Sequence, residues 1–248
     1  MSDQAFWSDD GLEIPALTAA QMREVDRIAV EEFDLSILQM MENAGRNLAQ
    51  NVMDMLGQTA AQVTILAGAG GNGGGGLCGA RHLHNRGFNV NLVLDRGADA
   101  LRGAASHQLH ILQAAGLQAL APSEVEGTIR RADLVVDALI GYSLRGTPRR
   151  RVAELIALCN QCARRVLCLD VPSGLDVTTG EAPGLVVHPH RTLTLALPKT
   201  GLRDIPGELY VADIGIPPEV YRQLGLSVEP FFGSAYWIRL RAKAEHSA

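Results

Sequence analysis

Residues 68–76 form the segment whose composition says most about chemistry. Seven of these nine positions are glycine, and they follow the apolar run 63–67. Because glycine has no Cβ, its backbone N–H groups can approach a ligand closely, and the N-terminus of a following helix attracts an anion. The segment therefore predicts a binding site for a phosphate or another anion.

Acid–base groups stand at the ends of later apolar segments. Asp137 lies in segment 133–139, and Asp170 follows segment 166–169. A positioned carboxylate can donate and accept a proton, so Asp170, just before Ser173, is the candidate acid–base group. A carboxylate that only caps a turn is the alternative for both aspartates. Lys199, which follows segment 192–196, is expected to stabilise a turn.

Hydrophobic periodicity and capping signals predict the elements that position these residues. Thr18 and Gln21 form a capping-box pattern before a helix that runs to about residue 32, and a second helix follows Ser36. Beyond residue 60, strands alternate with helices. The expected strands are 63–67, 89–94, 133–139, 166–169, 192–196 and 209–212, with a short run at 117–120, and the expected helices are 77–85, 103–115 and 152–163.

This alternation indicates the fold class. Segments 134–139 (LVVDAL) and 166–170 (VLCLD) are apolar without alternation of polar and apolar residues, which is typical of a sheet covered by helices on both faces. We predict an α/β fold, with a single doubly wound, mostly parallel, Rossmann-like sheet, helices on both faces and an N-terminal helical segment. The expected organisation is a tail at 1–16, one domain at 17–235 and a tail at 236–248. Ligands of such sheets bind beyond the carboxyl ends of the strands, so the polar groups named above are expected to converge.

The composition argues against several classes of function. The 248 residues are 47% hydrophobic and carry a net charge of −5, without the basic, aromatic-rich patches of nucleic-acid-binding proteins. No stretch approaches the roughly 18 apolar residues of a membrane span, and the acidic N-terminus lacks a signal-peptide pattern, so a cytoplasmic protein is expected. The four cysteines have apolar neighbours, as buried thiols do, and no histidine has the spacing of a metal ligand.

A dinucleotide-dependent dehydrogenase is one alternative. Gly68, Gly70 and Gly73 match the G-x-G-x-x-G fingerprint after a strand, and Asp95 ends the next strand, where an acid could bind a ribose. However, the glycines continue through Gly76, where a dehydrogenase would begin its helix. A long helical segment also precedes the motif, which usually opens the domain.

Six motifs occur in a fixed order along the chain and carry a family resemblance. They are MENAG at 41–45, GGNGGGG at 70–76, VDALIG at 136–141, DVPSGLD at 170–176, ALPKTGL at 196–202 and GELYVADIGIP at 207–217. The series resembles the YjeF N-terminal domain family, whose best known activity is NAD(P)H-hydrate epimerase. The resemblance spans residues 17 to about 218.

The resemblance implies a reaction, an ion and a set of contacts. The reaction interconverts the R and S forms of hydrated NADH and NADPH (NADHX and NADPHX) in nicotinamide cofactor repair. One K+ ion per subunit would be held by Asn72, Asp137 and Ser173, oxygen donors that suit a hard cation. The implied substrate contacts are Gly71, Asn72, Gly73, Gly74, Gly75, Gly141, Tyr142, Ser143, Leu144, Arg145, Gly146, Thr147 and Asp170.

The resemblance also implies partners. A separate NAD(P)H-hydrate dehydratase would act downstream on the S form, because 248 residues leave no room for that enzyme in this chain. Apolar residues near the N-terminus, Ile37, Leu38, Met40 and Met41, are compatible with a homodimer face and equally with a core. Neither nucleic acid nor membrane is expected as a partner.

Two positions depart from the family pattern. Family members usually carry N-N-G-G-D-G, and here Gly71 replaces the first asparagine and Gly75 the aspartate. The loss of this carboxylate removes a hydrogen-bond acceptor for a ligand hydroxyl. A non-catalytic nucleotide-binding or scaffold member of the same fold is therefore the second hypothesis.

Overall fold

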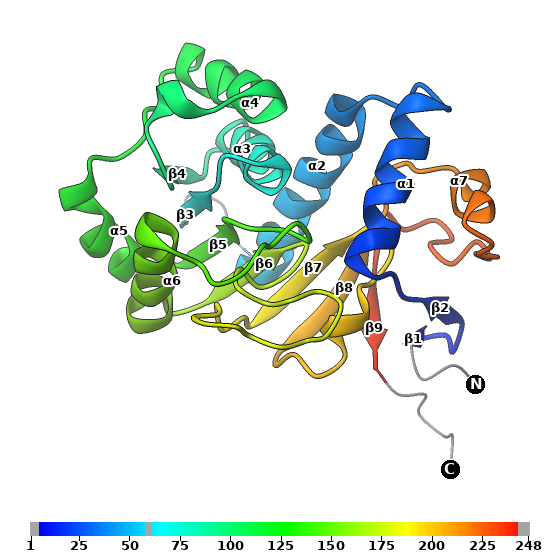
Figure 1. Cartoon of the computed structure of the whole chain (residues 1–248). Coiled ribbons are helices and arrows are strands. Elements are labelled where there is room, and N and C mark those ends of the chain that lie inside the picture. The colour runs from blue at the N-terminus through cyan, green and yellow to red at the C-terminus, as the bar shows by residue number, and fades with distance from the viewer. Residues whose placement is uncertain (1–4, 58–60, 243–248) are drawn as a thin grey trace.

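A mixed sheet forms the centre of the protein in the computed structural model, which describes residues 5–57 and 61–242 (Figure 1). Within these residues the strand order is β2-β1-β9-β8-β7-β6-β5-β3-β4. The strands are β1 (Ala5–Ser8), β2 (Glu13–Pro15), β3 (Gln62–Ala67), β4 (Asn89–Leu94), β5 (Leu134–Ala138), β6 (Val166–Leu169), β7 (Arg191–Leu195), β8 (Glu208–Ala212) and β9 (Trp237–Arg241). Neighbours from β4 to β8 pair in parallel, and β9, β1 and β2 add an antiparallel edge.

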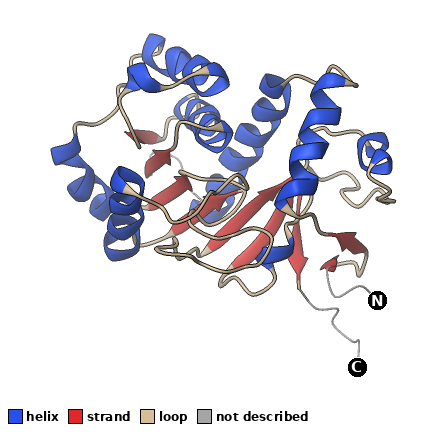
Figure 2. Ribbon diagram, in the orientation of Figure 1, coloured by secondary structure: helices blue, strands red, loops and turns tan. Residues whose placement is uncertain are grey.

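Helices cover both faces of the parallel strands (Figure 2). They are α1 (Ala19–Glu31), α2 (Ile37–Leu56), α3 (Gly71–His84), α4 (Gly103–Ala114), α5 (Val125–Arg131), α6 (Arg150–Cys162) and α7 (Pro218–Gln223). Helices α2, α3 and α4 share a core with Ile65 and Val136, whereas α5 and α6 pack with Leu66 and Val135. Because successive side chains of a strand point to opposite faces, one apolar strand serves both layers. No helix within the described residues is long and apolar enough to cross a membrane.

The first two helices begin where the sequence predicted them, and each begins with a capping box. Thr18 accepts a hydrogen bond from Gln21 N, and the Gln21 side chain accepts one from Thr18 N. Ser36 and Gln39 form the same reciprocal pair before α2. Each pair satisfies two backbone donors that the first turn of a helix leaves free, so these starts were predictable from local sequence.

The glycine-rich segment differs from its expected form. The sequence predicted a loop through residue 76 and a helix from residue 77, but α3 begins at Gly71. A Cβ at Gly73 would lie 1.6 Å from the carbonyl oxygen of Gly68, and one at Gly76 would lie 2.5 Å from Ala138 Cβ. The glycines are therefore required for close packing of the helix, and this packing outweighs their poor helix propensity.

The chain ends also differ from the expected organisation. The segments expected as tails, 1–16 and 236–248, contain the strands β1, β2 and β9 of the sheet. Phe6, Ile14 and Leu240 are buried there, which gives these strands an apolar anchor. Residues 1–4 and 243–248 of the expected tails lie outside the described residues. These short strands lie at the antiparallel edge of the sheet, outside the run of alternating strands and helices from which the other strands were predicted.

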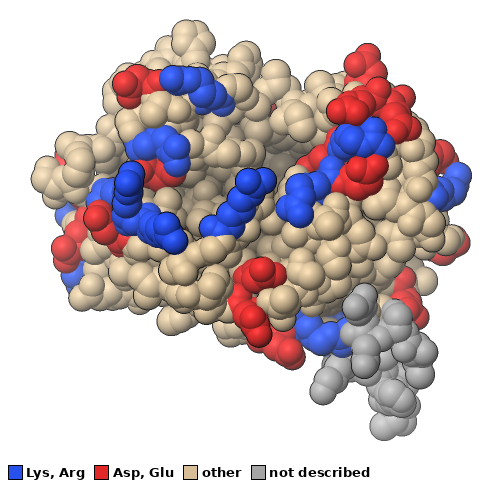
Figure 3. Space-filling view, in the orientation of Figure 1, with Lys and Arg blue, Asp and Glu red and all other residues tan. Residues whose placement is uncertain are grey.

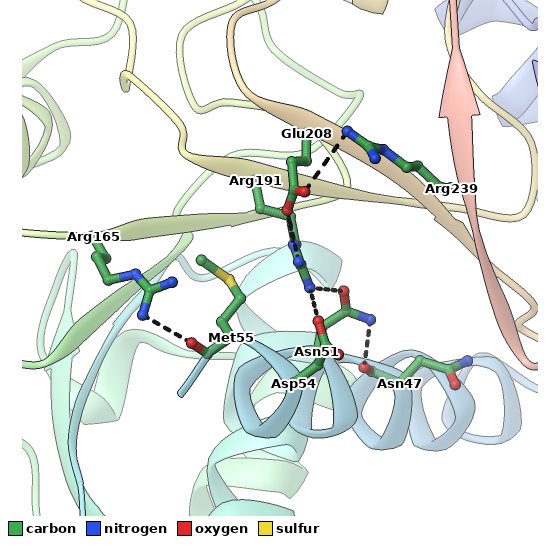
Figure 4. Close-up of polar contacts among 8 residues, drawn as sticks. All are labelled: Asn47, Asn51, Asp54, Met55, Arg165, Arg191, Glu208 and Arg239. Carbon is green, nitrogen blue, oxygen red and sulfur yellow. Dashed lines mark hydrogen bonds and ion pairs between the residues drawn. The ribbon is translucent and has the colours of Figure 1, made fainter. Parts of the chain in front are cut away.

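An arginine holds α2 against the amino ends of β7 and β8 (Figure 4). Arg191 Nη1 lies 2.6 Å from Asp54 Oδ2, and Arg191 Nη2 lies 2.6 Å from Glu208 Oε2. The guanidinium also lies 4.4 Å from the centre of the Tyr210 ring. This cluster is at the opposite end of the strands from the cavity described below, so it stabilises the scaffold and leaves the carboxyl ends free.

Matched glycine substitutions test the packing of α3. Gly73→Ala should lower the free energy of unfolding by about 3 kcal/mol, because its Cβ would collide with backbone and not with a movable side chain. Gly71→Ala is the control, since a Cβ at Gly71 would have no heavy atom of the described residues within 4 Å, its chain neighbours and its own helix backbone aside. Urea denaturation should show Gly71→Ala to be neutral or more stable by up to about 1 kcal/mol. Equal stability of the two variants would contradict the packing argument.

Candidate functional site

A cavity of about 530 Å³ lies beyond the carboxyl ends of the parallel strands. It is lined by Gly71 and Asn72 from the start of α3, by Gly141 and Tyr142 after β5, and by Asp170 after β6. Figure 3 shows a hollow in this face of the molecule with basic side chains near its edge. Convergence of these strand ends therefore forms a pocket of the size that small ligands and cofactors occupy.

Asp170 is held by several donors at the floor of this cavity. Its Oδ1 accepts a hydrogen bond from Lys199 Nζ at 2.5 Å, and its Oδ2 accepts one from Tyr142 N at 3.1 Å. The residue is 3% exposed and has a φ of 65°, a left-handed conformation that aspartate tolerates better than most residues. The tight turn after β6 thus aims the carboxylate into the cavity.

Lys199 has a role that the sequence analysis did not predict. It was expected to stabilise a turn, but its side chain is 1% exposed and pairs with Asp170. Its ammonium also donates to Leu195 O at 2.7 Å and to Thr194 Oγ1 at 3.2 Å. These three acceptors satisfy all three ammonium donors, so the buried charge is fully paired. The sequence feature that could have indicated this buried pair is the position of the lysine inside the largely apolar segment 196–202, where a solvated lysine is unusual.

Asp137 and Ser173 form a second buried polar group behind the cavity wall. Ser173 N donates to Asp137 Oδ2 at 2.8 Å, and Ser173 Oγ donates to Asp137 Oδ1 at 2.6 Å. Burial raises the pKa of the Asp137 carboxyl, and the hydrogen bonds from Ser173 oppose part of this rise. The Ser173 hydroxyl also accepts a hydrogen bond from Ile140 N at 2.8 Å, which ties the group to the loop after β5.

Asn72 has a buried oxygen without a hydrogen-bond partner among the described residues. Its Nδ2 donates to Leu169 O at 3.1 Å, whereas its Oδ1 has no such partner. A Cβ at Gly141 would lie 3.2 Å from Asn72 Cβ and 3.1 Å from Asp170 Oδ2, so Gly141 packs closely against both side chains. An unpaired buried acceptor costs free energy unless a ligand or ion satisfies it.

The remaining sequence-predicted contacts separate into two sets. Gly75 and Ser143 line the cavity together with the residues named above. Gly73 and Gly74 instead pack against Gly68 and Met41. The described residues that line the cavity also exclude four predicted contacts: Leu144, Arg145, Gly146 and Thr147. The Thr147 hydroxyl instead donates a hydrogen bond to Pro183 O at 3.2 Å.

Asp26 is a further cavity residue that the sequence analysis missed. It lies on α1 and accepts a hydrogen bond from Tyr142 Oη at 2.5 Å. Burial raises the pKa of Asp26, although the hydrogen bond from Tyr142 acts in the opposite direction. The sequence feature that could have indicated this position is that Asp26 lies on the same face of the predicted helix as the apolar residues Met22 and Ala29.

One polar cluster brings a histidine and a thiol together at the α2–α3 contact. His82 Nε2 lies 2.8 Å from Glu42 Oε1, and the atoms of Glu42, Cys78 and His82 are close enough to hold a metal ion. However, Arg81 pairs with Glu42, and burial raises the pKa of the Cys78 thiol to about 12. The neutral thiol and the guanidinium oppose metal binding. The sequence did not indicate this grouping because Glu42 is on another helix.

Comparisons with known proteins agree on one family. The model of the YjeF-related protein N-terminus matches residues 37–201. The NAD(P)H-hydrate epimerase of Dehalogenimonas lykanthroporepellens is 47% identical over 246 residues, covering 97% of this chain and 98% of that protein. The bifunctional NAD(P)H-hydrate repair enzyme Nnr of Hyperthermus butylicus is 37% identical over 85% of this chain and 40% of that protein. The crystal structure of yeast ynu0, YNL200c, has a TM-score of 0.82 at 22% identity and covers 91% of this chain and 100% of that chain.

Fold and site together define an α/β protein with a cavity at the carboxyl ends of a mostly parallel sheet. The chain belongs to the YjeF-related N-terminal family. This membership confirms the resemblance that the six ordered motifs carry. The likeness to the yeast structure supports the α/β fold alone.

A double-mutant cycle tests the buried pair. Lys199→Met should lower the free energy of unfolding by about 3 to 5 kcal/mol, because it leaves the Asp170 carboxylate buried without its cation. The double variant Lys199→Met/Asp170→Asn should be more stable than the sum of the two single changes predicts, by about 1 kcal/mol or more. Urea denaturation measures all four proteins. Strict additivity would show that the two side chains are not coupled.

Proposed function

We propose that this protein epimerises the R and S forms of NADHX and NADPHX in nicotinamide cofactor repair. The observation that carries the proposal is the buried Asp170–Lys199 pair on the floor of a cavity that begins at the glycine-rich start of α3. A relative that is 47% identical over nearly the full chain is named NAD(P)H-hydrate epimerase. The activity named for that relative is thus compatible with the site in this chain.

The reaction needs one group that moves a proton. In the substrate, the hydrated carbon carries a hydroxyl beside the ring nitrogen, and inversion requires a bond at that carbon to open and to form again on the other face. Asp170 takes the hydroxyl proton as the carbon–nitrogen bond breaks and the carbon–oxygen bond becomes a carbonyl, and it delivers this proton to the ring nitrogen; closure on the other face reverses both transfers, so no atom or electron is gained or lost. Asp170 is the proposed proton carrier, since it lines the cavity and is held by Lys199 and Tyr142.

The substrate contacts follow from the cavity lining. Backbone N–H groups at Gly71 and Asn72 begin α3, so they and the helix dipole suit the pyrophosphate. Gly75, Gly141 and the segment 142–143 complete the proposed contacts near the reacting ring. The proposal takes the sheet to be doubly wound and Rossmann-like, a fold in which ligands bind at this edge. A dehydratase would then use the S form.

We infer that a potassium ion binds beside this cavity. The residues fit a hard cation, because Asn72 Oδ1 is buried without a hydrogen-bond partner in the part of the chain that the structure describes, and Asp137 and Ser173 supply a carboxylate and a hydroxyl. Asn72, Asp137 and Ser173 would hold the ion. When bound, it supplies a positive charge near the pyrophosphate end and satisfies the free amide oxygen.

A role as a non-catalytic scaffold is the second candidate function, and the presence of glycine at position 75, where the family usually has aspartate, is the observation that favours it. A Cβ at Gly75 would lie 3.0 Å from Leu169 Cδ2, at the cavity lining, so glycine leaves this wall without the family's carboxylate. Asp170 and Lys199 nevertheless remain paired on the cavity floor. Their retention favours the epimerase over the scaffold.

Asp170→Asn tests the proton carrier. It should lower kcat for R-NADHX by about 100-fold or more, because the amide can no longer carry the proton. The assay follows consumption of R-NADHX in the presence of a dehydratase specific for the S form. Asp133→Asn is the matched control, since Asp133 caps Gln62 N at the amino end of the sheet. A wild-type rate equal to that of spontaneous epimerisation would refute the proposed epimerase activity. An Asp170→Asn rate equal to that of the wild type would show that another group transfers the proton.

Thermal unfolding in different salts tests the ion. Potassium chloride should raise the Tm of the wild type by about 2 to 4 °C over choline chloride of equal concentration, through binding to the folded state. Asn72→Ala should lose this increment. Asn160→Ala, which removes another amide bonded to the backbone, should keep it. A potassium shift that persists in Asn72→Ala would show that the ion binds elsewhere.

A further inference from the structure

Asp95 and Arg96 form a charged pair in the wall of the same cavity, and the epimerisation chemistry does not use it. Asp95 follows β4 directly, and both residues line the cavity with Gly70 and Gly71. Arg96 Nε lies 3.1 Å from Asp95 Oδ1, and Arg96 Nη2 lies 2.9 Å from Asp95 Oδ2. The carboxylate side chain is 4% exposed, whereas the guanidinium side chain is 53% exposed.

The position of the pair relates it to the glycine-rich start of α3. Strands β3 and β4 are neighbours, and Asp95 N donates to Ala67 O at 3.1 Å, just before that start. In dinucleotide-binding sheets, an acid at the end of the next strand accepts a hydrogen bond from the ribose 2′-hydroxyl. An arginine nearby accommodates a 2′-phosphate instead. This chain places both groups side by side.

We propose that Asp95 and Arg96 read the 2′ position of the adenosine ribose, an inference that rests on the proposed dinucleotide substrate. Asp95 accepts a hydrogen bond from the 2′-hydroxyl of NADHX. Arg96 turns from Asp95 to the 2′-phosphate of NADPHX, which it binds with the same two parallel N–H groups. The pair therefore decides how well each of the two substrates is used.

The exposures of the two side chains favour this role over a purely structural one. A largely exposed arginine paired with its chain neighbour adds little stability, because water competes for it. The same exposure leaves the guanidinium free to move when a stronger anion arrives. The buried carboxylate, in contrast, needs a hydrogen-bond donor, which Arg96 supplies in the free protein and the ribose 2′-hydroxyl supplies in the NADHX complex.

Substrate selectivity is the test. The ratio of kcat/KM for R-NADPHX to that for R-NADHX should fall about tenfold in Arg96→Ala, since tenfold corresponds to one lost charge-assisted contact. In Asp95→Asn the ratio should rise about tenfold, because the repulsion of the phosphate is removed and Arg96 is released. Arg102→Ala is the matched control, as Arg102 contacts the carbonyls of Asp99 and Leu101 and is outside the cavity lining. Its ratio should equal that of the wild type.

Ligand binding separates this inference from the proposed activity. Titration calorimetry with ADP-ribose and 2′-phospho-ADP-ribose should give the same opposite shifts in the Kd ratio for the two variants, whether or not the protein is an epimerase. If the wild type shows no epimerase turnover but the two variants still shift the Kd ratio in opposite directions, only the proposed epimerase activity is refuted. Unchanged ratios in both variants, or no binding of either ligand by the wild type, would overturn the inference.

Discussion

The close approach of α3 to the sheet is the constraint on which the site depends. A Cβ at Gly68 would lie 1.9 Å from the carbonyl oxygen of Leu139, and one at Gly73 would lie 1.6 Å from that of Gly68. The first turn of α3 is thereby seated against the ends of β3 and β5. This contact places Asn72 beside Gly141 and presents the helix N-terminus to the cavity. Side chains in these positions would separate the groups that the cavity brings together.

Buried polar groups on the cavity floor and behind its wall are stable when each has a hydrogen-bond or ion-pair partner. Lys199 satisfies Asp170, and Ser173 satisfies Asp137 from the turn that follows β6. Removal of these groups from water strengthens their interactions, but it also makes an unpaired group costly. The same reasoning gives Asn72 its importance, since its Oδ1 is the member of this group that lacks a partner among the described residues. A site with such fixed dipoles can orient a substrate with little rearrangement.

Much of the fold and part of the site could be predicted from local patterns. The start of α1 after Thr18, the apolar strand 166–169 and the position of Asp170 at its end all follow from capping, burial and strand-end rules. Those rules use residues that are near each other in the chain. They could not predict that Lys199 reaches back to Asp170, or that Asp26 of α1 meets Tyr142, because these contacts join distant segments.

The sequence by itself therefore determined the alternation of strands and helices, the family motifs and the residue types at the strand ends. Tertiary structure alone decided which of these residues share a cavity, that residues 71–76 are helix and not loop, and that short terminal segments join the sheet. The physical reason is that local preferences depend on a few neighbouring dihedral angles and side chains. Close packing and charge pairing instead depend on distances between segments, and these distances are set only when the whole sheet assembles.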